Sequence, residues 1–306
     1  MYSQIIRSDA YRQDLLCFIF STYGIEGRNL SPAKRGFYGE TWRLETADDN
    51  CFFVKLVYPE AYKAVYERSF PVIQHLNDQG IGYISRIVKT KASRLCTVFD
   101  GAVLGVFDWI DGKLTETDET KAPEYGMMAK IYTVPPGDVP ISREDFGGGN
   151  AQFFLEQWMI LEDKSLRALL EKHREILEYR LERQHQVSGW CRGDSTAFYI
   201  THGDAGGNLL VNGGQYYIVD WDTPLLAPPE RDAWCMCGHA WAREAFHHAL
   251  CQNGIAYTLR PERLIYYCYE YFFYYLSCYL DVRASAVTVE TFINGWITQS
   301  LAYADR

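Results

Sequence analysis

Apolar positions along the chain follow two patterns, one up to about residue 107 and another from Lys113 onward. The first part contains two stretches with helical spacing and several short runs with the character of strands. The helical stretches are 9–23 and about 60–79, and the strand-like runs are 37–44, 51–57, 95–99 and 102–107. Between the last two runs, Asp100-Gly101 is a strong hairpin signal. This part is therefore expected to form a small antiparallel sheet with helices beside it.

From Lys113 onward helical spacing dominates. The expected helices are about 119–132, 150–161, 164–186, 231–252, 261–282 and 287–303, and short strand-like pieces interrupt them at 199–220. We therefore expect an α+β protein with a small sheet lobe over 1–107, a linker over 108–112 and a larger helical lobe over 113–306. A length of 306 residues is comfortable for two such lobes.

The charge balance narrows the possible partners. The net charge is −9 and the pI about 5.3, so the chain lacks the basic excess with which a general nucleic-acid binder meets phosphates. An acidic surface can attract a cationic small molecule, although acidity also serves solubility alone. We expect no nucleic-acid partner, and the sequence leaves the oligomeric state open.

The cysteines and the apolar runs indicate in which cellular compartment the protein is expected. The nine cysteines are odd in number and most sit in apolar runs, which favours reduced thiols in the cytoplasm. The N-terminus shows no signal peptide. The most apolar run, 264–280, is interrupted by Glu270 and falls short of the roughly 20 residues that span a bilayer. We expect a cytoplasmic protein without a membrane partner.

The most informative stretch runs from His202 to Asp222. It contains the segments H-G-D-A-G-G-N and I-V-D-W-D, with Asp204 in a glycine-rich loop, Asn208 four residues later and Asp220 after the next strand. A hairpin-like return brings Asp220 beside Asn208. One carboxylate that orients an attacking hydroxyl, with an Asn/Asp pair that holds Mg²⁺ against triphosphate oxygens, is the set that phosphoryl transfer needs. The alternative, in which these residues only cap turns, is less favoured because both halves are present.

The first part of the chain offers matching groups for a nucleotide. Lys55 lies in an apolar strand, which is unusual for a lysine without a partner. Glu67, on the following helix, is the expected partner that would hold Lys55 against the α- and β-phosphates. Ahead of them, Gly36, Tyr38 and Gly39 lie in a hairpin candidate whose backbone N–H groups would cover phosphates. A plain turn is the alternative there.

The combined H-G-D-x-x-x-N and I-V-D-W-D pattern resembles the aminoglycoside-phosphotransferase family of kinase-like enzymes. The segment 216–232 is similar to that of the family's spectinomycin phosphotransferase branch. The resemblance implies a two-lobed protein-kinase-like fold, ATP or GTP as the donor and Mg²⁺ as the metal. It also implies that the linker backbone at Phe107, Trp109 and Ile110 pairs with the adenine edge.

The resemblance assigns supporting roles as well. It implies that Asp232 braces the catalytic loop, that His202 holds the loop and is not the base, and that Asp222 lies close to the metal. Two positions depart from the family pattern, because Tyr132 stands where histidine is common and Ala205-Gly206-Gly207 replaces Leu/His-Pro after the catalytic Asp. These departures bear on the substrate more than on the chemistry.

We therefore expect O-phosphorylation of a small hydroxylated molecule, first of all an aminocyclitol or aminoglycoside antibiotic. The alternatives are a metabolic kinase for choline, homoserine or a sugar derivative, and a pseudokinase without turnover; the intact Lys55, Asp204, Asn208 and Asp220 argue against the last. A cationic acceptor would need carboxylates of the helical lobe, although most of the candidates are better explained as solvated helix faces. The candidates are Glu156, Glu162, Asp163, Glu270 and Asp281.

Overall fold

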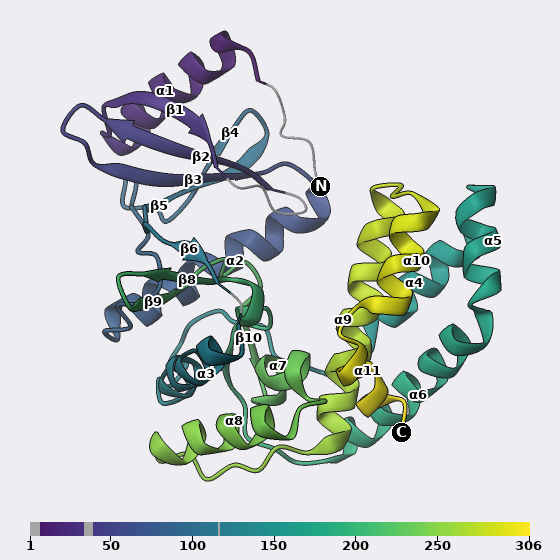
Figure 1. The fold of residues 1–306 in the computed structure, drawn as a ribbon. Helices are drawn as coiled ribbons and strands as arrows, with labels where there is room; N and C mark the ends of the chain where they lie inside the picture. The colour runs from purple at the N-terminus through teal and green to yellow at the C-terminus, as the bar shows by residue number, and fades with distance from the viewer. Residues whose placement is uncertain (1–6, 34–38, 116) are drawn as a thin grey trace. The chain divides into compact units, whose positions relative to one another are not determined.

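The computed structural model describes residues 7–33, 39–115 and 117–306, and it divides into two compact units. The sheet unit comprises the described residues up to Thr115 together with 136–142 and 207–224, and the helical unit comprises 117–135, 143–206 and 225–306. Figure 1 shows most of the strands in the first unit and most of the helices in the second. The predicted α+β class is confirmed.

A five-stranded antiparallel sheet forms the centre of the sheet unit, in the order β1-β2-β3-β5-β4. Its strands are β1 (Gly27–Pro32), β2 (Gly39–Thr46), β3 (Cys51–Val57), β4 (Thr97–Phe99) and β5 (Ala102–Asp108), and its helices are α1 (Asp9–Tyr23) and α2 (Glu60–Asp78). Strand β1 was not expected, because Leu30 is its only buried residue and gives no apolar alternation.

The two faces of β3 have different partners because side chains alternate along a strand. Val54 and Leu56 are fully buried in a core shared with Leu15 and Ile19 of α1. Lys55 lies on the opposite face, with its ammonium 5.7 Å from the ring centre of Tyr66 on α2. The alternation of side chains along β3 thus places Lys55 on the face of the sheet that α2 covers.

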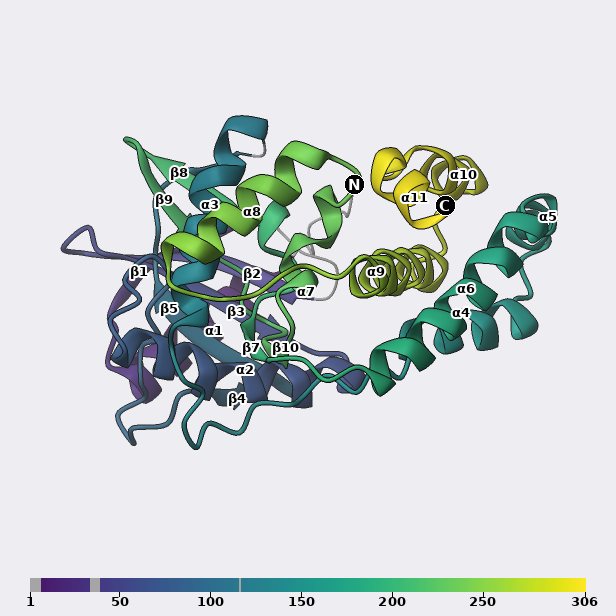
Figure 2. The ribbon, with the colours of Figure 1, turned by 90° about the horizontal axis from the view of Figure 1, so that it is seen from below.

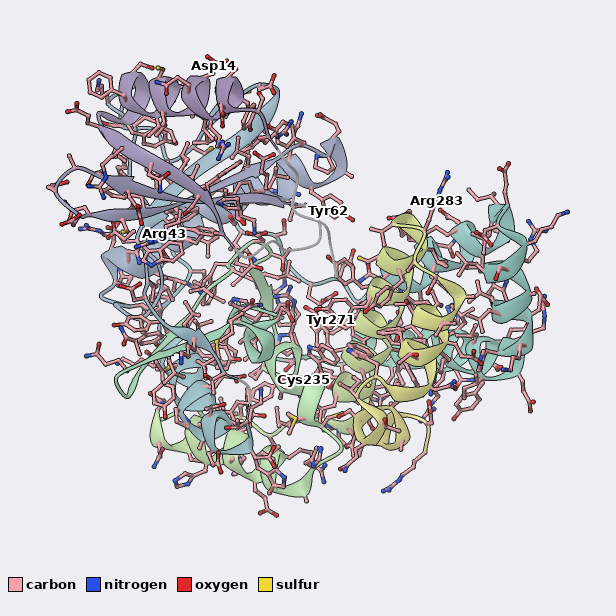
Figure 3. All side chains as sticks on the ribbon, turned by 45° about the horizontal axis from the view of Figure 1, so that its top comes forward. Asp14, Arg43, Tyr62, Cys235, Tyr271 and Arg283 are labelled. Carbon is pink, nitrogen blue, oxygen red and sulfur yellow. The ribbon has the colours of Figure 1, made fainter. Side chains whose placement is uncertain are left out.

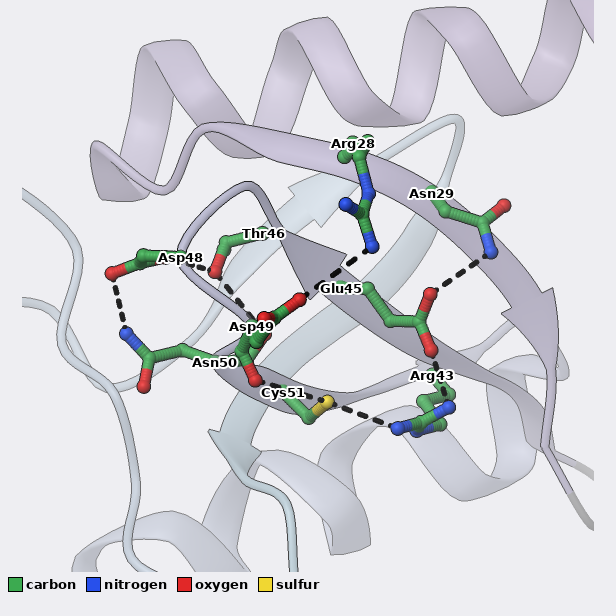
Figure 4. Close-up of polar contacts among 9 residues, drawn as sticks. All are labelled: Arg28, Asn29, Arg43, Glu45, Thr46, Asp48, Asp49, Asn50 and Cys51. Atoms are coloured by element: carbon green, nitrogen blue, oxygen red, sulfur yellow. Dashed lines mark hydrogen bonds and ion pairs between the residues drawn. The ribbon is translucent and has the colours of Figure 1, made fainter.

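The turn between β2 and β3 is stabilised by short-range polar contacts (Figure 4). Thr46 N–H donates to the Asn50 carbonyl at 3.0 Å, and Asn50 Nδ2 donates to Asp48 Oδ2 at 2.7 Å. Asp49 has φ 61°, a left-handed conformation that aspartate adopts more readily than most residues. The turn fixes the register that places Thr41 opposite Lys55.

A second, three-stranded sheet in the order β6-β8-β9 also belongs to the sheet unit. Its strands are β6 (Lys113–Leu114), β8 (Leu209–Asn212) and β9 (Gln215–Ile218). Gly213 and Gly214 join β8 to β9 with φ 55° and 83°, the two positive values that a tight hairpin of primed type requires. Ile218 N–H donates to the Tyr83 carbonyl at 2.9 Å. Residues 207–224 therefore pack with the sheet unit, although we expected the whole chain after residue 112 to form the helical lobe.

In the helical unit, helices pack around α9 (Pro261–Asp281), and in Figure 2 α9 lies between α10 and α11 on one side and α4 and α6 on the other. Phe272, Phe273 and Leu276 of α9 are fully buried. The other elements are α3 (Asp118–Tyr132), α4 (Gly149–Ile160), α5 (Lys164–Lys172), α6 (Arg174–Gly193), β7 (Tyr199–Thr201), β10 (Leu225–Ala227), α7 (Glu230–Ala233), η2 (Trp234–Met236), α8 (Ala240–Gln252), α10 (Ala286–Gly295) and α11 (Thr298–Ala304). Within the described ranges, none of the helices has the length and apolar character needed to cross a bilayer.

Candidate active site

Lys55 is the centre of an ion-pair cluster in the sheet unit. Its ammonium lies 2.7 Å from Oδ1 of Asp220 and also binds Oδ2 of Asp222. The lysine is only 6 % exposed. Burial alone would lower the pKa of Lys55, but the charges of Asp220 and Asp222 outweigh it and raise the pKa above the usual value. The two carboxylates therefore favour the charged form of Lys55.

The prediction that Lys55 pairs with Glu67 is wrong, because the ammonium binds Asp220 and Asp222 instead. Glu67 is exposed on α2, whereas Tyr66, Ser69 and Phe70 form the buried face of that helix. Residues one apart on a helix point about 100° away from each other, so a helix that turns Tyr66 toward the sheet turns Glu67 toward solvent. The carboxylates that pair with Lys55 come instead from the segment after β9.

Asp220 has a strained backbone and a partly exposed side chain. Its φ is 64°, a strained region in which functional residues are often found. Its side chain is 40 % exposed, while that of Asp222 is 12 % exposed. Trp221 between them is buried and donates from Nε1 to the Ile218 carbonyl at 3.1 Å. The turn thus buries the tryptophan, anchors Asp222 on Lys55 and makes Asp220 the more exposed of the two carboxylates.

The predicted hairpin brings Asn208 next to this turn. Val219 N–H donates to the Asn208 carbonyl at 3.0 Å, and Leu209 is paired with Ile218. Asn208 and Asp220 therefore flank the end of the β8–β9 ladder. They offer one neutral and one charged oxygen, the hard donors that Mg²⁺ accepts when phosphate and water complete its shell. Among the described residues no group of three or more His, Cys, Asp or Glu side chains suits a metal, so a metal held here would depend on the phosphates.

The phosphate-covering segment is only partly described. Gly36 and Tyr38 lie outside the described residues, and Gly39 is the first residue of β2. A Cβ atom at Gly39 would lie 2.8 Å from Cε of Lys55. A side chain at position 39 would therefore displace the lysine side chain. The position of Lys55 thus favours glycine at position 39.

The linker residues lie at the end of β5. Phe107 is buried and stacks on Phe70 at 5.6 Å, and Trp109 packs at 6.4 Å from Phe53. Asp108 N–H donates to the Arg86 carbonyl at 2.9 Å and Trp109 N–H to the Cys51 carbonyl at 3.2 Å.

Asp204 belongs to the helical unit, in the loop after β7. Its backbone N–H donates to Nδ1 of His202 at 3.1 Å, and its Oδ1 accepts a hydrogen bond from the Tyr275 hydroxyl at 3.1 Å. The His202 ring is buried and engaged with the loop backbone, which supports its expected role of holding the loop. Tyr275 was not found from the sequence, because 71 positions separate it from Asp204.

Asp232 holds the same loop from the first turn of α7. Its carboxylate accepts hydrogen bonds from the backbone N–H of Gly203 and of His202, and from the Tyr132 hydroxyl at 2.7 Å. These contacts support the bracing role expected of Asp232. They also explain Tyr132, whose hydroxyl reaches Asp232 from α3 at the position where the family commonly has histidine.

Gly203 is required by the packing around the loop. Its φ is 89°, and a Cβ atom there would lie 2.3 Å from the Tyr271 hydroxyl and 2.5 Å from the Arg231 guanidinium. Tyr271 projects from α9 and is labelled in Figure 3. Any other residue at position 203 would have to move Tyr271 or Arg231.

A buried ion pair lies behind the loop and was also missed. Lys121 and Glu124 of α3 are 2 % and 1 % exposed and pair at 3.1 Å. The Lys121 ammonium also approaches the Gly206 carbonyl at 3.5 Å. A Cβ atom at Gly206 would lie 3.0 Å from that ammonium, so the small residues after Asp204 make room for it.

The sheet unit therefore contains a buried lysine, two carboxylates and an asparagine, and the helical unit contains a braced aspartate loop. These are the groups that a small-molecule kinase uses. A sequence model of the phosphotransferase enzyme family matches residues 29–265, which is more than half of the chain. The chain belongs to this phosphotransferase family. The predicted family and enzyme class are confirmed.

Solved structures show that the kinase-like fold extends over the whole chain. Spectinomycin phosphotransferase, APH(9)-Ia, in complex with ADP and spectinomycin, is similar with a TM-score of 0.77 and 18 % identity over 99 % of this chain and 100 % of that one. Amicoumacin kinase hAmiN, in complex with AMP-PNP, Ca²⁺ and Ami, is similar with a TM-score of 0.67 and 12 % identity, over 94 % and 92 % of the two chains. An aminoglycoside phosphotransferase from Alicyclobacillus acidocaldarius has a TM-score of 0.61 and 12 % identity, over 99 % and 96 %. None of the curated protein sequences matches the chain.

Proposed function

We propose that the chain transfers the γ-phosphoryl group of ATP or GTP to a hydroxyl group of a small molecule. The observation that carries this proposal is the Lys55–Asp220–Asp222 cluster beside Asn208. It offers a cation for phosphate oxygens and a partly exposed carboxylate for a metal, and both lie in the sheet unit, which also contains the linker.

In this proposal Asn208 and Asp220 hold Mg²⁺, and Lys55 binds the α- and β-phosphates. Mg²⁺ supplies neutralisation of the charge on the phosphate oxygens. Asp222 would keep Lys55 in place, because it binds the ammonium and is the more buried of the two carboxylates. This assigns different tasks to the two aspartates, in line with their different exposure.

The adenine edge is assigned to the linker at Phe107, Trp109 and Ile110. Because the N–H groups of Asp108 and Trp109 bond to carbonyls of their own unit, we assign the donor for the adenine to the Ile110 N–H. Phe107 packs on Phe70 and Trp109 packs on Phe53. These ring contacts would then fix the position of the linker backbone.

Asp204 is assigned as the base. Only three residues separate it from Asn208, and a fully extended chain gains at most about 3.6 Å per residue, so the chain itself keeps base and metal ligand close. As the acceptor oxygen bonds to the γ-phosphorus, the bond to the bridging oxygen breaks and the nucleoside diphosphate leaves. The proton of the acceptor hydroxyl passes to the Asp204 carboxylate.

The acceptor class is proposed to be an aminocyclitol or aminoglycoside. The net charge of −9 favours a cationic acceptor, and the similar spectinomycin phosphotransferase was solved with spectinomycin bound. Phosphorylation of such an antibiotic would give resistance, and a reaction that uses ATP or GTP as donor would fit a cytoplasmic enzyme.

The helical unit restricts which carboxylates would bind amines. Glu270 is engaged by Asn150 N–H at 3.1 Å and by Gln184 at 2.8 Å, and Asp163 caps the N-terminus of α5. Asp281 accepts a hydrogen bond from Gln157. Of the five candidates, Glu162 and Glu156 are exposed. Glu156 accepts a hydrogen bond from Gln152 within its own helix, so its contact is local to α4.

The test is nucleoside diphosphate release, with ATP–Mg²⁺ and with GTP–Mg²⁺, against a panel of spectinomycin, an aminoglycoside, choline and homoserine. We expect release to rise with an aminocyclitol or an aminoglycoside. A rise with choline or homoserine alone would replace the antibiotic with a metabolic acceptor and leave the catalytic assignments standing. No release with any acceptor and no binding of ATP–Mg²⁺ would contradict the proposed function.

A further inference from the structure

Tyr275 makes its hydrogen bond to the proposed base from α9, a helix most of whose residues are buried. It lies on α9, next to the fully buried Leu276 and close to Phe272. Its hydroxyl donates to Oδ1 of Asp204 at 3.1 Å. Because the terminal torsion of an aspartate has a broad energy minimum, a carboxylate in a loop turns easily unless one of its oxygens is held.

The ring of Tyr275 is fixed by other aromatic rings. It meets Tyr274 at 5.1 Å and Trp296 at 5.3 Å, both edge to face. Trp296 in turn packs at 5.0 Å from Phe292 and at 5.4 Å from Trp234. The position of the hydroxyl is therefore set by side-chain packing within the helical unit.

The same rings hold the residue before the base. Trp234 donates from Nε1 to the Gly203 carbonyl at 3.2 Å and stacks on Tyr271 with ring centres 4.6 Å apart and planes 6° apart. Trp234, Tyr271, Tyr275 and Trp296 are called the aromatic cluster below. One member holds the backbone of the loop and another holds the side chain of the base.

The Tyr275 hydroxyl remains a donor at neutral pH. Burial, and then the charge of Asp204, raise the pKa of Tyr275 well above its usual value. A neutral hydroxyl that donates to an ionised carboxylate makes a charge-assisted hydrogen bond, which is stronger than one between neutral groups.

We infer that Tyr275 is a positioning residue for the reaction: through Oδ1 it holds the Asp204 carboxylate in the orientation in which it meets the acceptor hydroxyl. The inference rests on the proposed function, since it presupposes that Asp204 is the base. It adds α9 and the aromatic cluster to the catalytic loop as the part of the chain that orients the base. The reaction then depends on a contact between positions 71 residues apart.

The test is steady-state kinetics of Tyr275→Phe with ATP–Mg²⁺ and the acceptor that the panel identifies as best. The change removes one hydroxyl and leaves the ring. We expect kcat to fall about 10- to 100-fold, as for loss of one hydrogen bond to a charged group. KM for ATP and for the acceptor should stay within about threefold, because the substrates' own binding groups are untouched.

Tyr269→Phe is the matched control. Tyr269 lies on the same helix, is buried and donates to Asp305 at 2.8 Å, so it loses an equivalent bond away from the loop. We expect Tyr269→Phe to lose stability but to keep kcat. An equal loss of kcat in both variants would assign the effect to weakened packing and overturn the inference.

Asp204→Asn, measured in parallel, separates the two proposals. If Asp204→Asn is inactive and Tyr275→Phe has the kcat of the wild type, the positioning role is wrong and the proposed function stands. If Asp204→Asn retains full turnover, the proposed base is wrong. Crystal structures of wild type and Tyr275→Phe give a readout without an acceptor: the carboxylate should turn in the variant, and the same orientation in both would overturn the inference.

Discussion

Lys55 Nζ lies 2.7 Å from Oδ1 of Asp220, a residue 165 positions later in the chain. Asp222 binds the same ammonium and is the more buried of the two carboxylates. The lysine therefore has one buried partner and one partly exposed partner. In the proposed function, Asp222 holds Lys55 in place and Asp220 is a ligand of the metal.

Asp222→Asn is expected to lower the free energy of unfolding by roughly 1–3 kcal/mol, because a buried lysine loses one of its charged partners. Asp220 limits the loss by remaining bound to the ammonium. Urea denaturation measures it. Asp9→Asn is the control, since Asp9 pairs with Arg12 on the surface, where such pairs contribute about 0–1 kcal/mol. An unchanged unfolding midpoint for Asp222→Asn would show that Asp222 does not stabilise Lys55.

Asp220→Ala is expected to remove the dependence of nucleotide binding on Mg²⁺, and Asn208→Ala to weaken it less. Asp220 supplies a charged oxygen and Asn208 a neutral one, and Mg²⁺ favours carboxylate ligands. Calorimetric titration of ATP with and without Mg²⁺ measures both. If both variants keep the full effect of Mg²⁺ on ATP affinity, the metal is held by other residues.

Gly203→Ala is expected to destabilise the fold and to abolish most of the activity. The new Cβ atom would meet Tyr271 and Arg231 at 2.3 and 2.5 Å, at a φ of 89° that side chains rarely adopt. Thermal unfolding and diphosphate release measure the two effects. Gly189→Ala is the control, because position 189 lies within α6 with nothing within 4 Å of a Cβ atom, and alanine favours a helix. Equal melting temperatures for the two variants would contradict the account of the loop.

Glu270 predicts a pH dependence of stability. Burial, which outweighs the hydrogen bond from Asn150, raises the pKa of Glu270 from 4.5 to about 7. Between these values the folded protein keeps a proton that the unfolded chain has lost, so the stability present below pH 4.5 falls as the pH rises to about 7. The shift corresponds to roughly 2–4 kcal/mol.

Glu270→Gln should remove this slope and raise the free energy of unfolding above pH 7. A neutral amide does not ionise, so the folded protein no longer has to bury a charge at this position. The buried Oε1 of Gln184, which has no hydrogen-bond partner among the described residues, would accept from the new amide. Urea denaturation from pH 4.5 to 8 compares the variant with wild type and with Glu156→Gln, a change at an exposed position of α4. A slope that persists in Glu270→Gln would assign it to other groups.

The sequence predicts the parts of the site that are local in the chain. The alternation around Lys55 and the glycine turn between Asn208 and Asp220 each lie within one hairpin, so period and turn chemistry are sufficient. Lys55 itself needed a partner, and the prediction took the acidic residue on the next helix. Which face α2 turns inward depends on Tyr66 and Phe70 filling the space over Gly105, which is a matter of tertiary packing.

Contacts between distant segments were outside the reach of local patterns. Tyr132 and Asp232 are 100 positions apart, and Tyr275 and Asp204 are 71 apart. The spacing of the tyrosines of α9 predicts a buried apolar face of the helix. Nothing in that spacing indicates which tyrosine hydroxyl contacts a carboxylate. The same holds for residues 207–224, which join the sheet unit through pairing with β6 and the bond from Ile218 to Tyr83.

The central claim is that Asp204 serves the transfer of a phosphoryl group to a hydroxyl. The most direct measurement is mass spectrometry of the acceptor after incubation with ATP, Mg²⁺ and either the wild type or Asp204→Asn. The amide is nearly isosteric but cannot take the hydroxyl proton, and general bases contribute about 10²–10⁴-fold. The account predicts a phosphorylated acceptor with the wild type, a rate lower by that factor with the variant, and unchanged ATP affinity. An Asp204→Asn variant that phosphorylates the acceptor at the wild-type rate would contradict it.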